Sequence, residues 1–295
     1  MILAVQEIHK SYGKQRVLNN ISFTIEEPQI VALVGPNGSG KSTLLNIITN
    51  LVEADEGQVT ILNESNQNTQ IFKNVSYMQD NSVLYDYLTG YDHLQFIANV
   101  QGLSKEQIIK TAERVGMDSY LNKRVGKYSL GMKQHLLLTM AILNEPELLI
   151  LDEPLNGLDP TSAIRVRNLL VELYEEGTTI LLSSHNLSEI DRVTSNILFL
   201  KDGQLIKEDL TELKKINYEF FVDNPAQVTE LLLNLDVKVI ETGDDFVSFH
   251  LKEASLNDIV LELMKQNIEL LDIQKKVIGS EDRYQEIFNK KDVSQ

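Results

Sequence analysis

The stretch Gly35-Pro36-Asn37-Gly38-Ser39-Gly40-Lys41-Ser42 fits the pattern G-x-x-x-x-G-K-[ST] without a mismatch. An apolar run, Ile30 to Val34, leads into the first glycine, and a helical pattern follows Ser42. Glycines let a backbone bend so that successive N–H groups converge, and the following helix presents its positive end. The stretch therefore predicts a strand, a phosphate-binding loop and a helix.

The last residues of this loop predict its chemistry. We expect Lys41 to reach the β- and γ-phosphates of a nucleotide and the Ser42 hydroxyl to sit on Mg²⁺. Thr43 completes the expected nucleotide-binding set. The alternative is a chance glycine-rich turn between a strand and a helix.

Composition limits the kinds of partner that the chain can take. The formal net charge of −16 argues against an extended nucleic-acid surface, since binding a phosphate backbone needs clustered Lys and Arg. The absence of cysteine excludes a disulfide framework, a thiol nucleophile and a Cys-based zinc site. The longest apolar run, Leu136 to Leu143, is far shorter than the ~20 residues that span a bilayer, and no signal peptide is recognisable. We expect a soluble protein that needs a partner for any work at a membrane.

The pattern along the 295 residues predicts two domains, 1–210 and 211–295. In the first, unbroken apolar runs predict parallel strands covered on both faces, and a helical subdomain covers about residues 86–145. The segments Leu3 to Ile8 and Ile21 to Ile25 predict edge strands of an antiparallel β-layer. The fold class expected for residues 1–210 is an α/β P-loop NTPase core.

The second domain has the order βαββαβ, followed by a short amphipathic helix from Glu281 to Asn289. This order is typical of an α+β ferredoxin-like fold. We expect a charged helical connector from Glu208 to Lys215 between the two domains.

A second apolar run, Leu148 to Leu151, ends in two carboxylates. A buried parallel strand delivers its C-terminal residues to the ligand edge of the sheet, so Asp152 is placed to hold the Mg²⁺ water shell. Glu153 would orient and polarise the attacking water. The alternative for both is an ordinary strand that ends in acidic loop residues.

With these motifs in place, residues 1–210 resemble the ATP-binding cassette (ABC) subunit of an ABC transporter. Ser129-Leu130-Gly131-Met132-Lys133-Gln134 resembles the ABC signature, although Leu130 stands where the family usually has glycine. The resemblance implies that Ser129, Gly131 and a helix N-terminus face the γ-phosphate of a nucleotide held by the opposite subunit. Outside this context Ser129 is simply a helix N-cap.

Three further positions follow from the resemblance. Asn156-Gly157-Leu158-Asp159-Pro160 resembles the D-loop that passes between two cassettes, with Asp159 in the nucleotide-binding set. His185, after Ser183-Ser184, resembles the switch histidine that donates to the γ-phosphate. Tyr12 occupies the position of the aromatic ring that stacks on adenine. Without the resemblance, the Asn156 to Pro160 segment would be an ordinary loop, His185 a solvated histidine and Tyr12 part of a turn.

The Q-loop fits less cleanly. Counting back from Leu84-Tyr85 puts Asp80 where the family has a glutamine that reaches the metal water shell, whereas an alternative register uses Gln79. Similar bacitracin and lantibiotic exporter cassettes can carry an acidic residue here. Both registers stay open, and the alternative for each residue is a loop position beyond a strand.

The resemblance implies an ATPase subunit that uses ATP and Mg²⁺ to power a separate transmembrane permease, as an exporter of a drug, peptide or lipid-like substrate. Lys41, Glu153 and His185 would be catalytic. The implied partners are a second identical subunit and the permease, which holds the protein at the cytoplasmic face of the membrane. One rival is a soluble ABC ATPase that acts on nucleic acid or ribosomes, and another is a module that uses ATP only as a switch, which requires an inert Glu153.

Overall fold

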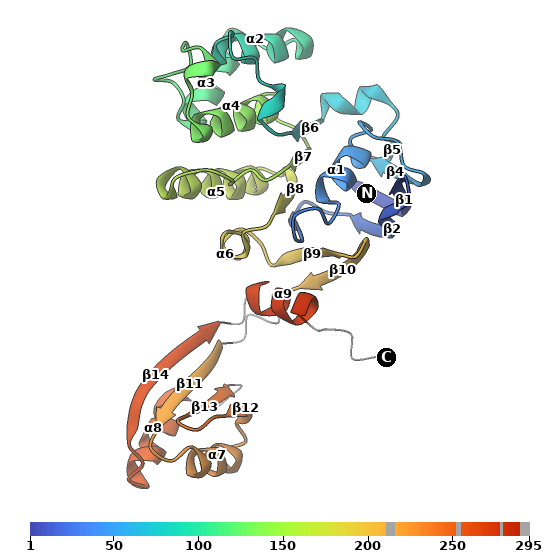
Figure 1. Cartoon of the computed structure of the whole chain (residues 1–295). Coiled ribbons are helices and arrows are strands. Elements are labelled where there is room, and N and C mark those ends of the chain that lie inside the picture. Colours follow the sequence, from blue (N-terminus) through green and yellow to red (C-terminus); the bar gives the residue numbers. More distant parts are fainter. Residues whose placement is uncertain (211–215, 252–254, 278–279, 290–295) are drawn as a thin grey trace. The chain divides into compact units, whose positions relative to one another are not determined.

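The computed structural model describes residues 1–210, 216–251, 255–277 and 280–289. The chain divides into two compact units, Met1–Asp209 and Leu210–Gln295 (Figure 1). Among the described residues, no helix is both long and apolar enough to cross a membrane.

Among the described residues of the first unit, a six-stranded sheet has the order β10-β9-β3-β8-β7-β6. Its strands are β3 (Ile30–Val34), β6 (Val75–Met78), β7 (Leu148–Leu151), β8 (Thr179–Ser184), β9 (Asn196–Lys201) and β10 (Gln204–Asp209). All neighbours are parallel except β9 and β10. β3, β7 and β8 are buried along their whole length, as expected for strands covered on both faces. Their carboxyl ends therefore meet at one edge.

A smaller antiparallel sheet joins β1 (Leu3–Tyr12), β2 (Gln15–Ile25), β4 (Glu56–Ile61) and β5 (Glu64–Ser65) in the order β2-β1-β4-β5. The expected antiparallel layer is present, but β1 lies between β2 and β4, so the prediction of an edge strand was wrong for β1. One apolar cluster contains side chains of both sheets and of α1 (Lys41–Ile48). This helix follows the phosphate-loop sequence directly and is anchored by Leu44 and Leu45, which are fully buried.

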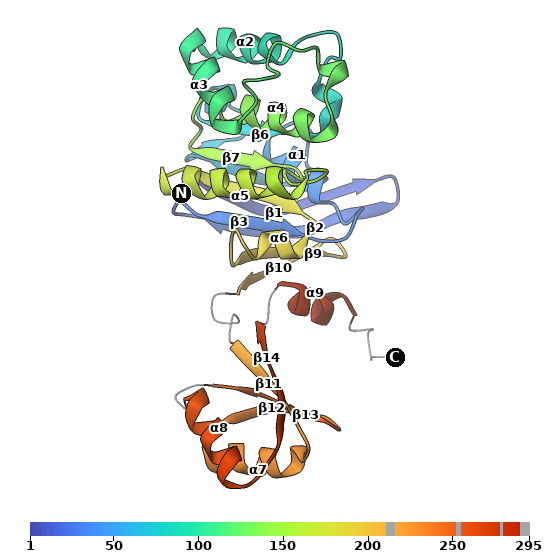
Figure 2. The ribbon, with the colours of Figure 1, turned by 90° about the vertical axis from the view of Figure 1, so that its left-hand side faces the viewer.

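The fully described stretch from 86 to 145 contains α2 (Gly90–Gln101), α3 (Lys105–Val115) and α4 (Leu130–Ile142). Figure 2 shows these helices gathered beyond β6, the edge strand of the six-stranded sheet. Thr89 and Ser104 form capping boxes at the starts of α2 and α3, and glycines in the left-handed region end both helices. The short 3₁₀ turns of the unit are η1 (Thr69–Lys73), η2 (Asn81–Val83) and η3 (Val125–Lys127).

The last part of the first unit contains α5 (Pro160–Glu175) and α6 (Leu187–Ile190), which flank β8 in sequence, and then the β9–β10 hairpin. The hairpin turns at Asp202 and Gly203, both with positive φ. Glu208 and Asp209 pair with β9 in this hairpin, so the expected helical connector is wrong at these residues. Strand pairing with β9 outweighs the tendency of this charged segment to form a helix. Residues 211–215 of the expected connector lie outside the described residues.

The described part of the second unit follows the predicted order of strands and helices. Its elements are β11 (Ile216–Val222), α7 (Pro225–Asn234), β12 (Lys238–Thr242), β13 (Phe246–His250), α8 (Leu256–Lys265), β14 (Leu270–Val277) and α9 (Ser280–Asn289). The strands form an antiparallel sheet in the order β12-β13-β11-β14. Its core contains Phe220 and Phe249, whose rings meet edge to face with centroids 4.8 Å apart.

Candidate nucleotide-binding site

Two glycines of the loop between β3 and α1 have no room for a side chain. A Cβ at Gly35 would lie 2.7 Å from the Leu200 carbonyl oxygen, and a Cβ at Gly40 would lie 2.9 Å from Val17 Cγ1. Gly40, with a φ of 104°, is also the N-cap of α1. Gly38 has a φ of 79°, and a Cβ there would meet no atom within 4 Å. The loop is thus fixed against the protein at its two ends and faces open space in its middle.

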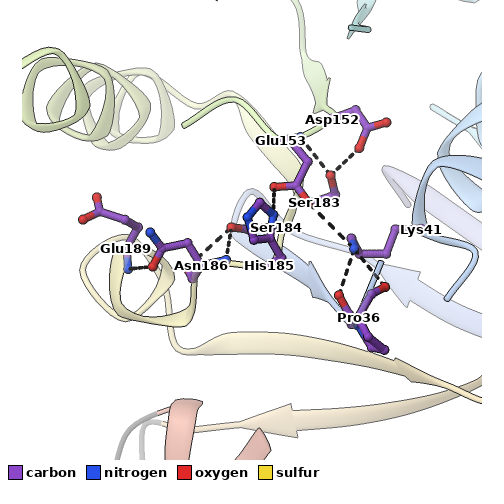
Figure 3. A network of polar contacts seen from close by, with 10 residues as sticks. Pro36, Lys41, Asp152, Glu153, Ser183, Ser184, His185, Asn186 and Glu189 are labelled. Carbon is purple, nitrogen blue, oxygen red and sulfur yellow. Dashed lines mark hydrogen bonds and ion pairs between the residues drawn. The ribbon is translucent and has the colours of Figure 1, made fainter. Parts of the chain in front are cut away.

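Lys41 folds back over this loop. Its Nζ donates to the carbonyl oxygens of Gly35 at 2.8 Å and of Pro36 at 3.4 Å (Figure 3). The same ammonium lies 3.7 Å from Glu153 Oε1, and the residue is only 7% exposed. A buried cation is therefore held at the mouth of the loop, mainly by neutral acceptors.

Ser183, a fully buried residue of β8, contacts both residues that follow β7, Asp152 through its carboxylate and Glu153 through its backbone. Its hydroxyl donates to Asp152 Oδ1 at 2.5 Å and accepts the backbone N–H of Glu153 at 2.9 Å. Glu153 has a φ of 51°, a left-handed conformation that costs a non-glycine residue roughly 1 kcal/mol or more. The hydrogen bond from its N–H to Ser183 supports this strained backbone.

His185 lies just beyond β8 and completes a row of charged and polar groups (Figure 3). Its Nδ1 is 2.9 Å from Glu153 Oε2, while 48% of its side chain remains exposed. The structure thus brings together Lys41, Glu153 and His185, which come from three separate segments of the sequence. Asp152 joins them through Ser183.

The remaining predicted phosphate ligands lie on the loop and the first turn of α1. Ser39 Oγ is buried and has no hydrogen-bond partner among the described residues, which is unusual for a hydroxyl. Ser42 is exposed and Thr43 is partly exposed. Pro36 and Asn37 are exposed at the loop surface. An orphaned hydroxyl beside an open glycine loop fits a site for an anion that accepts hydrogen bonds.

Ser129 and Asp159 each cap a helix. The Ser129 hydroxyl accepts the N–H of Met132 at the start of α4, and Asp159 accepts the N–H groups of Thr161 and Ser162 at the start of α5. The Ser162 hydroxyl also donates to Asp159 and holds the pKa of that carboxyl below its usual value. Within the described chain, neither capping residue is hydrogen-bonded to or ion-paired with Lys41, Glu153 or His185. The structure therefore does not join these two predicted residues to the Lys41 cluster.

Tyr12 lies at the end of β1, directly before the turn at Gly13. Its side chain is 52% exposed, and Lys10 Nζ lies 5.5 Å from the centre of its ring. One face of the ring is therefore contacted by a cation, and the side chain is still about half exposed.

Asp80 and Gln79 follow β6 and have different surroundings. Asp80 Oδ1 accepts the Ser82 N–H at 2.7 Å, and its hydrogen bonds with Ser82 lower the pKa of its carboxyl. Gln79 lines a cavity of about 270 Å³ together with side chains of α2 and α4. Burial raises the pKa of the Tyr77 phenol, and the nearby charges of Asp152 and Asp80 raise it further. Asp80 thus belongs to the same electrostatic neighbourhood as Asp152.

The glycine loop, the largely parallel sheet and the carboxylates after β7 define a P-loop nucleotide-binding protein. The family model described as "ABC transporter" matches residues 18–156. The chain is 32% identical over 296 residues to the ABC transporter ATP-binding protein YhcH of Bacillus subtilis (strain 168), covering 97% of this chain and 95% of that protein. It belongs to the family of ABC transporter ATP-binding proteins.

Named relatives include ATP-binding proteins of bacitracin transport and of lantibiotic transport. The bacitracin transport ATP-binding protein BcrA of Bacillus licheniformis is 32% identical, with 98% of this chain and 96% of that protein covered. The lantibiotic transport ATP-binding protein SrtF of Streptococcus pyogenes is 36% identical over 70% of this chain and 90% of that protein.

Solved structures show the same fold. An ATP-binding subunit of an ABC transporter superimposes with a TM-score of 0.66 at 26% identity and covers 90% of this chain and 100% of its own. A dimeric ATP-binding cassette in a post-hydrolysis state with ADP and Pi matches with a TM-score of 0.66 at 25% identity. The match covers 71% of this chain and 99% of that chain. The protein is the ATP-binding subunit of an ABC transporter, and it hydrolyses ATP for transport.

Sequence reasoning named Ser183 only as part of the Ser183-Ser184-His185 segment and gave it no role. Its position could have been inferred from the two neighbouring parallel strands, since Leu151 pairs with Leu182. The next residue of β8 must then lie beside the residues that follow β7.

Proposed function

We propose that this subunit powers an exporter as a pair of identical copies that close around two ATP molecules. The observation that carries the proposal is the row of contacts from the phosphate loop through Lys41 and Glu153 to His185. Phosphoryl transfer to water needs a cation for the phosphates, a base for the water and a hydrogen-bond donor for the developing charge. These three side chains supply that set.

In the proposed binding step, Lys41 turns from the carbonyl oxygens of Gly35 and Pro36 to the β- and γ-phosphates. Its buried ammonium gains by this exchange, because hydrogen bonds between ions are stronger than those to neutral carbonyls. The orphaned Ser39 hydroxyl gains a phosphate oxygen as acceptor. Backbone N–H groups of the loop and the first turn of α1, including Thr43, complete the cradle. Tyr12 would offer its ring to adenine.

Mg²⁺ would be held by the Ser42 hydroxyl, by Asp152 and by phosphate oxygens. These oxygen donors are of the kind that Mg²⁺ prefers. The described residues contain no cluster of three His, Asp or Glu side chains able to hold a metal ion, so phosphates and waters must complete the shell. When bound, Mg²⁺ would neutralise charge on the phosphates. Asp80 would act on the same water shell, and Gln79 is the alternative for that role.

Glu153 is the proposed general base for the attacking water. Ser183 fixes its backbone, and His185 holds Oε2, which leaves the carboxylate oriented toward the loop that holds Lys41. His185 would keep its Nδ1 contact with Glu153 and donate from Nε2 to the γ-phosphate. The water proton would pass to the Glu153 carboxylate as the water oxygen attacks the γ-phosphorus, while the bond from that phosphorus to the β–γ bridging oxygen breaks and ADP leaves with the electron pair.

The other half of each site would come from the second copy. Ser129, Gly131 and Asp159 cap or begin helices α4 and α5, and helix starts favour anions. Within the described part of one chain, Ser129 and Asp159 make no hydrogen bond or ion pair with Lys41, Glu153 or His185, which fits a site completed by a second copy. The dimeric ATP-binding cassette among the matching structures supports this arrangement.

The cavity beside Gln79 is the proposed docking place for a helix of the permease. Exposed aromatic side chains lie nearby in sequence: Tyr85 is 57% exposed, Tyr87 69% and Phe96 67%. Large exposed apolar side chains around a groove are typical of a surface that binds another protein. Contact with the membrane would occur through the permease alone, at the cytoplasmic face.

The names of the relatives suggest the cargo. BcrA and SrtF are named for bacitracin transport and lantibiotic transport, so we propose export of a peptide antibiotic or a similar drug or lipid-like compound. A non-transport ATPase that acts on nucleic acid or ribosomes is the rival. The net charge of −16 and the transport relatives disfavour it.

For the C-terminal domain, residues 211–295, we propose a ferredoxin-like fold with an accessory role beside the ATPase domain, residues 1–210. The sheet order β14-β11-β13-β12 supports this fold, because it interleaves the strands of two βαβ halves in one antiparallel sheet. Its proposed role is to brace the dimer or to regulate the ATPase.

The proposal is tested by replacing Lys41 and measuring both nucleotide binding and resistance. Lys41→Ala should abolish ATP binding or hydrolysis, because backbone N–H groups alone cannot neutralise the phosphates. Cells that depend on this subunit should then lose resistance to bacitracin or a lantibiotic. Lys123→Ala is the matched control, since Lys123 is an exposed lysine outside the site. Full ATP turnover by the Lys41→Ala protein would contradict the phosphate-loop assignment. Unchanged resistance together with lost turnover would contradict the proposed cargo.

A further inference from the structure

Gly157, in the loop between β7 and α5, lies directly beneath the side chain of Leu130. A Cβ at Gly157 would lie 2.2 Å from Leu130 Cδ2 and 2.8 Å from Cγ, so no other L-residue fits unless Leu130 moves. By contrast, the same Cβ would lie 3.8 Å from Leu130 Cβ, an ordinary contact distance. The close approach thus involves only the outer part of the leucine side chain.

Neighbouring residues show that this contact belongs to a larger packing of the two segments. A Cβ at Gly131 would lie 3.6 Å from Leu158 Cδ2 and 3.8 Å from the Gly157 carbonyl oxygen. The first turn of α4 therefore rests on the loop before α5. Leu130 itself is the first residue of α4 and remains 50% exposed on its other side.

These observations explain how a leucine can be tolerated at the start of α4. The side chain lies on a glycine of the neighbouring loop, which accepts it without a clash. If that glycine carried a side chain, Leu130 would be displaced from its place on the first turn of α4, whose leading N–H groups have no partner within the helix. A displaced leucine would cover the helix start that an anion approaches.

We propose that Gly157 is a positioning residue that receives the Leu130 side chain and keeps the start of α4 open for the nucleotide of the second copy. The proposal rests on the proposed function, since it needs α4 to face a nucleotide across a dimer. It makes the leucine of the signature and the glycine of the D-loop a coupled pair. The effect of a substitution at either residue on ATPase activity would then depend on which residue stands at the other position.

The test compares Gly157→Ala in two backgrounds, the natural chain and the Leu130→Ala variant. The alanine at 157 must adopt a φ of +74° in both backgrounds, so the backbone strain cancels in the comparison. Steady-state ATPase kinetics and the affinity of isolated subunits for a fluorescent ATP analogue are measured for all four proteins. Contacting residues commonly couple strongly enough to shift an equilibrium about tenfold.

We expect Gly157→Ala to raise the KM for ATP about tenfold in the natural chain and less than about threefold in the Leu130→Ala background. The affinity of the isolated subunit for the analogue should be the same in all four proteins, since the Lys41 loop is untouched. An equal rise of KM in both backgrounds would overturn the proposal. The two proposals can fail separately. If Lys41→Ala weakens binding of the analogue but Gly157→Ala raises the KM equally in both backgrounds, the proposed function stands and this inference fails.

Thermal melts cover the case in which Gly157→Ala does not fold in the natural chain. Recovery of a cooperative melt in the Leu130→Ala background would then support the same steric coupling. Failure to fold in both backgrounds would show that Gly157 is needed for its backbone conformation alone, and the inference would be wrong.

Discussion

At the residue scale, the site depends on one hydroxyl that bonds to the Asp152 carboxylate and to the backbone of Glu153. Ser183 is fully buried, and its bonds to Asp152 Oδ1 and to the Glu153 N–H fix both residues after β7. Because Glu153 is held with a φ of 51°, its direction depends on this support. The role proposed for Glu153 therefore depends on Ser183 in the neighbouring strand β8.

Ser183→Ala should lower kcat about tenfold or more, because a misplaced base loses much of its advantage. It should also destabilise the protein by about 1–3 kcal/mol, since the Glu153 N–H loses its partner. Ser184→Ala is the matched control: its hydroxyl accepts the N–H of Asn186 and touches neither carboxylate. Unfolding curves and ATPase rates of the two variants separate the effects. Equal kcat values for both would contradict the role of Ser183.

Asp80 and Gln79 are the positions where the sequence left two registers open. Asp80→Asn should lower ATPase activity and raise the Mg²⁺ concentration for half activity, because a carboxylate that acts near Asp152 is neutralised. Gln79→Ala should leave this Mg²⁺ dependence unchanged and weaken docking of the permease, since Gln79 lines the cavity between β6, α2 and α4. Titration of ATPase activity with Mg²⁺ measures the metal dependence of the two variants. The reverse pattern would assign the metal role to Gln79.

Motif spacing predicted most of the named residues because each motif is local. A loop of eight residues and a strand that ends in Asp152 and Glu153 can be read without knowing what lies beside them. Ser183 and the Leu130–Gly157 contact could not be predicted in this way, because they depend on the register of β7 and β8 and on the packing of α4. These contacts exist only in the tertiary structure.

At the element scale, α5 and α6 are joined by an ion pair that helps to place His185. Arg167 of α5 contacts Glu189 of α6, and the two side chains are only 10% and 20% exposed. α6 begins two residues after His185, so this pair anchors the segment that carries the imidazole. A second pair, Arg114 with Glu176, joins α3 to the end of α5 at the surface.

Arg167→Ala should destabilise the protein by about 3 kcal/mol, because Glu189 is left as an uncompensated, largely buried charge. Arg114→Ala should cost less than about 1 kcal/mol, since its partners are more than half exposed and screened by solvent. Denaturant melts give both values. A cost for Arg114→Ala equal to or larger than that for Arg167→Ala would contradict this account of the two pairs.

The sequence predicted the helices between residues 86 and 145 because their caps are encoded locally, as at Thr89 and Ser104. It failed at Glu208 and Asp209, where charge suggested a helix. The turn at Asp202 and Gly203 instead pairs these residues with β9. Strand pairing depends on a partner that a local pattern does not contain.

At the scale of the whole molecule, the chain consists of an ATPase unit and a second unit with its own core. The match to SrtF covers 70% of the chain, whereas the matches to YhcH and BcrA of Bacillus licheniformis cover nearly all of it. Every residue proposed for ATP chemistry lies in Met1–Asp209.

A chain of residues 1–210 should therefore fold with a cooperative melt and bind ATP with the affinity of the full chain. The physical reason is that both sheets and α1 share a core that uses no residue after 209. Calorimetry and titration with a fluorescent ATP analogue give the two quantities. Loss of the cooperative melt would show that the units share a core.

In the proposed mechanism, Glu153 activates water for ATP that is held between two copies of the chain. Glu153→Gln keeps the size of the side chain and removes the base. The most direct measurement is single-turnover hydrolysis of ATP by this variant, followed by size-exclusion chromatography with light scattering in ATP and Mg²⁺. We expect hydrolysis to fall at least ~10²-fold while ATP still binds and a dimer accumulates. Hydrolysis at the natural rate would contradict the role of Glu153 as the base, and a monomer under all conditions, even with the permease present, would contradict a site shared between two copies.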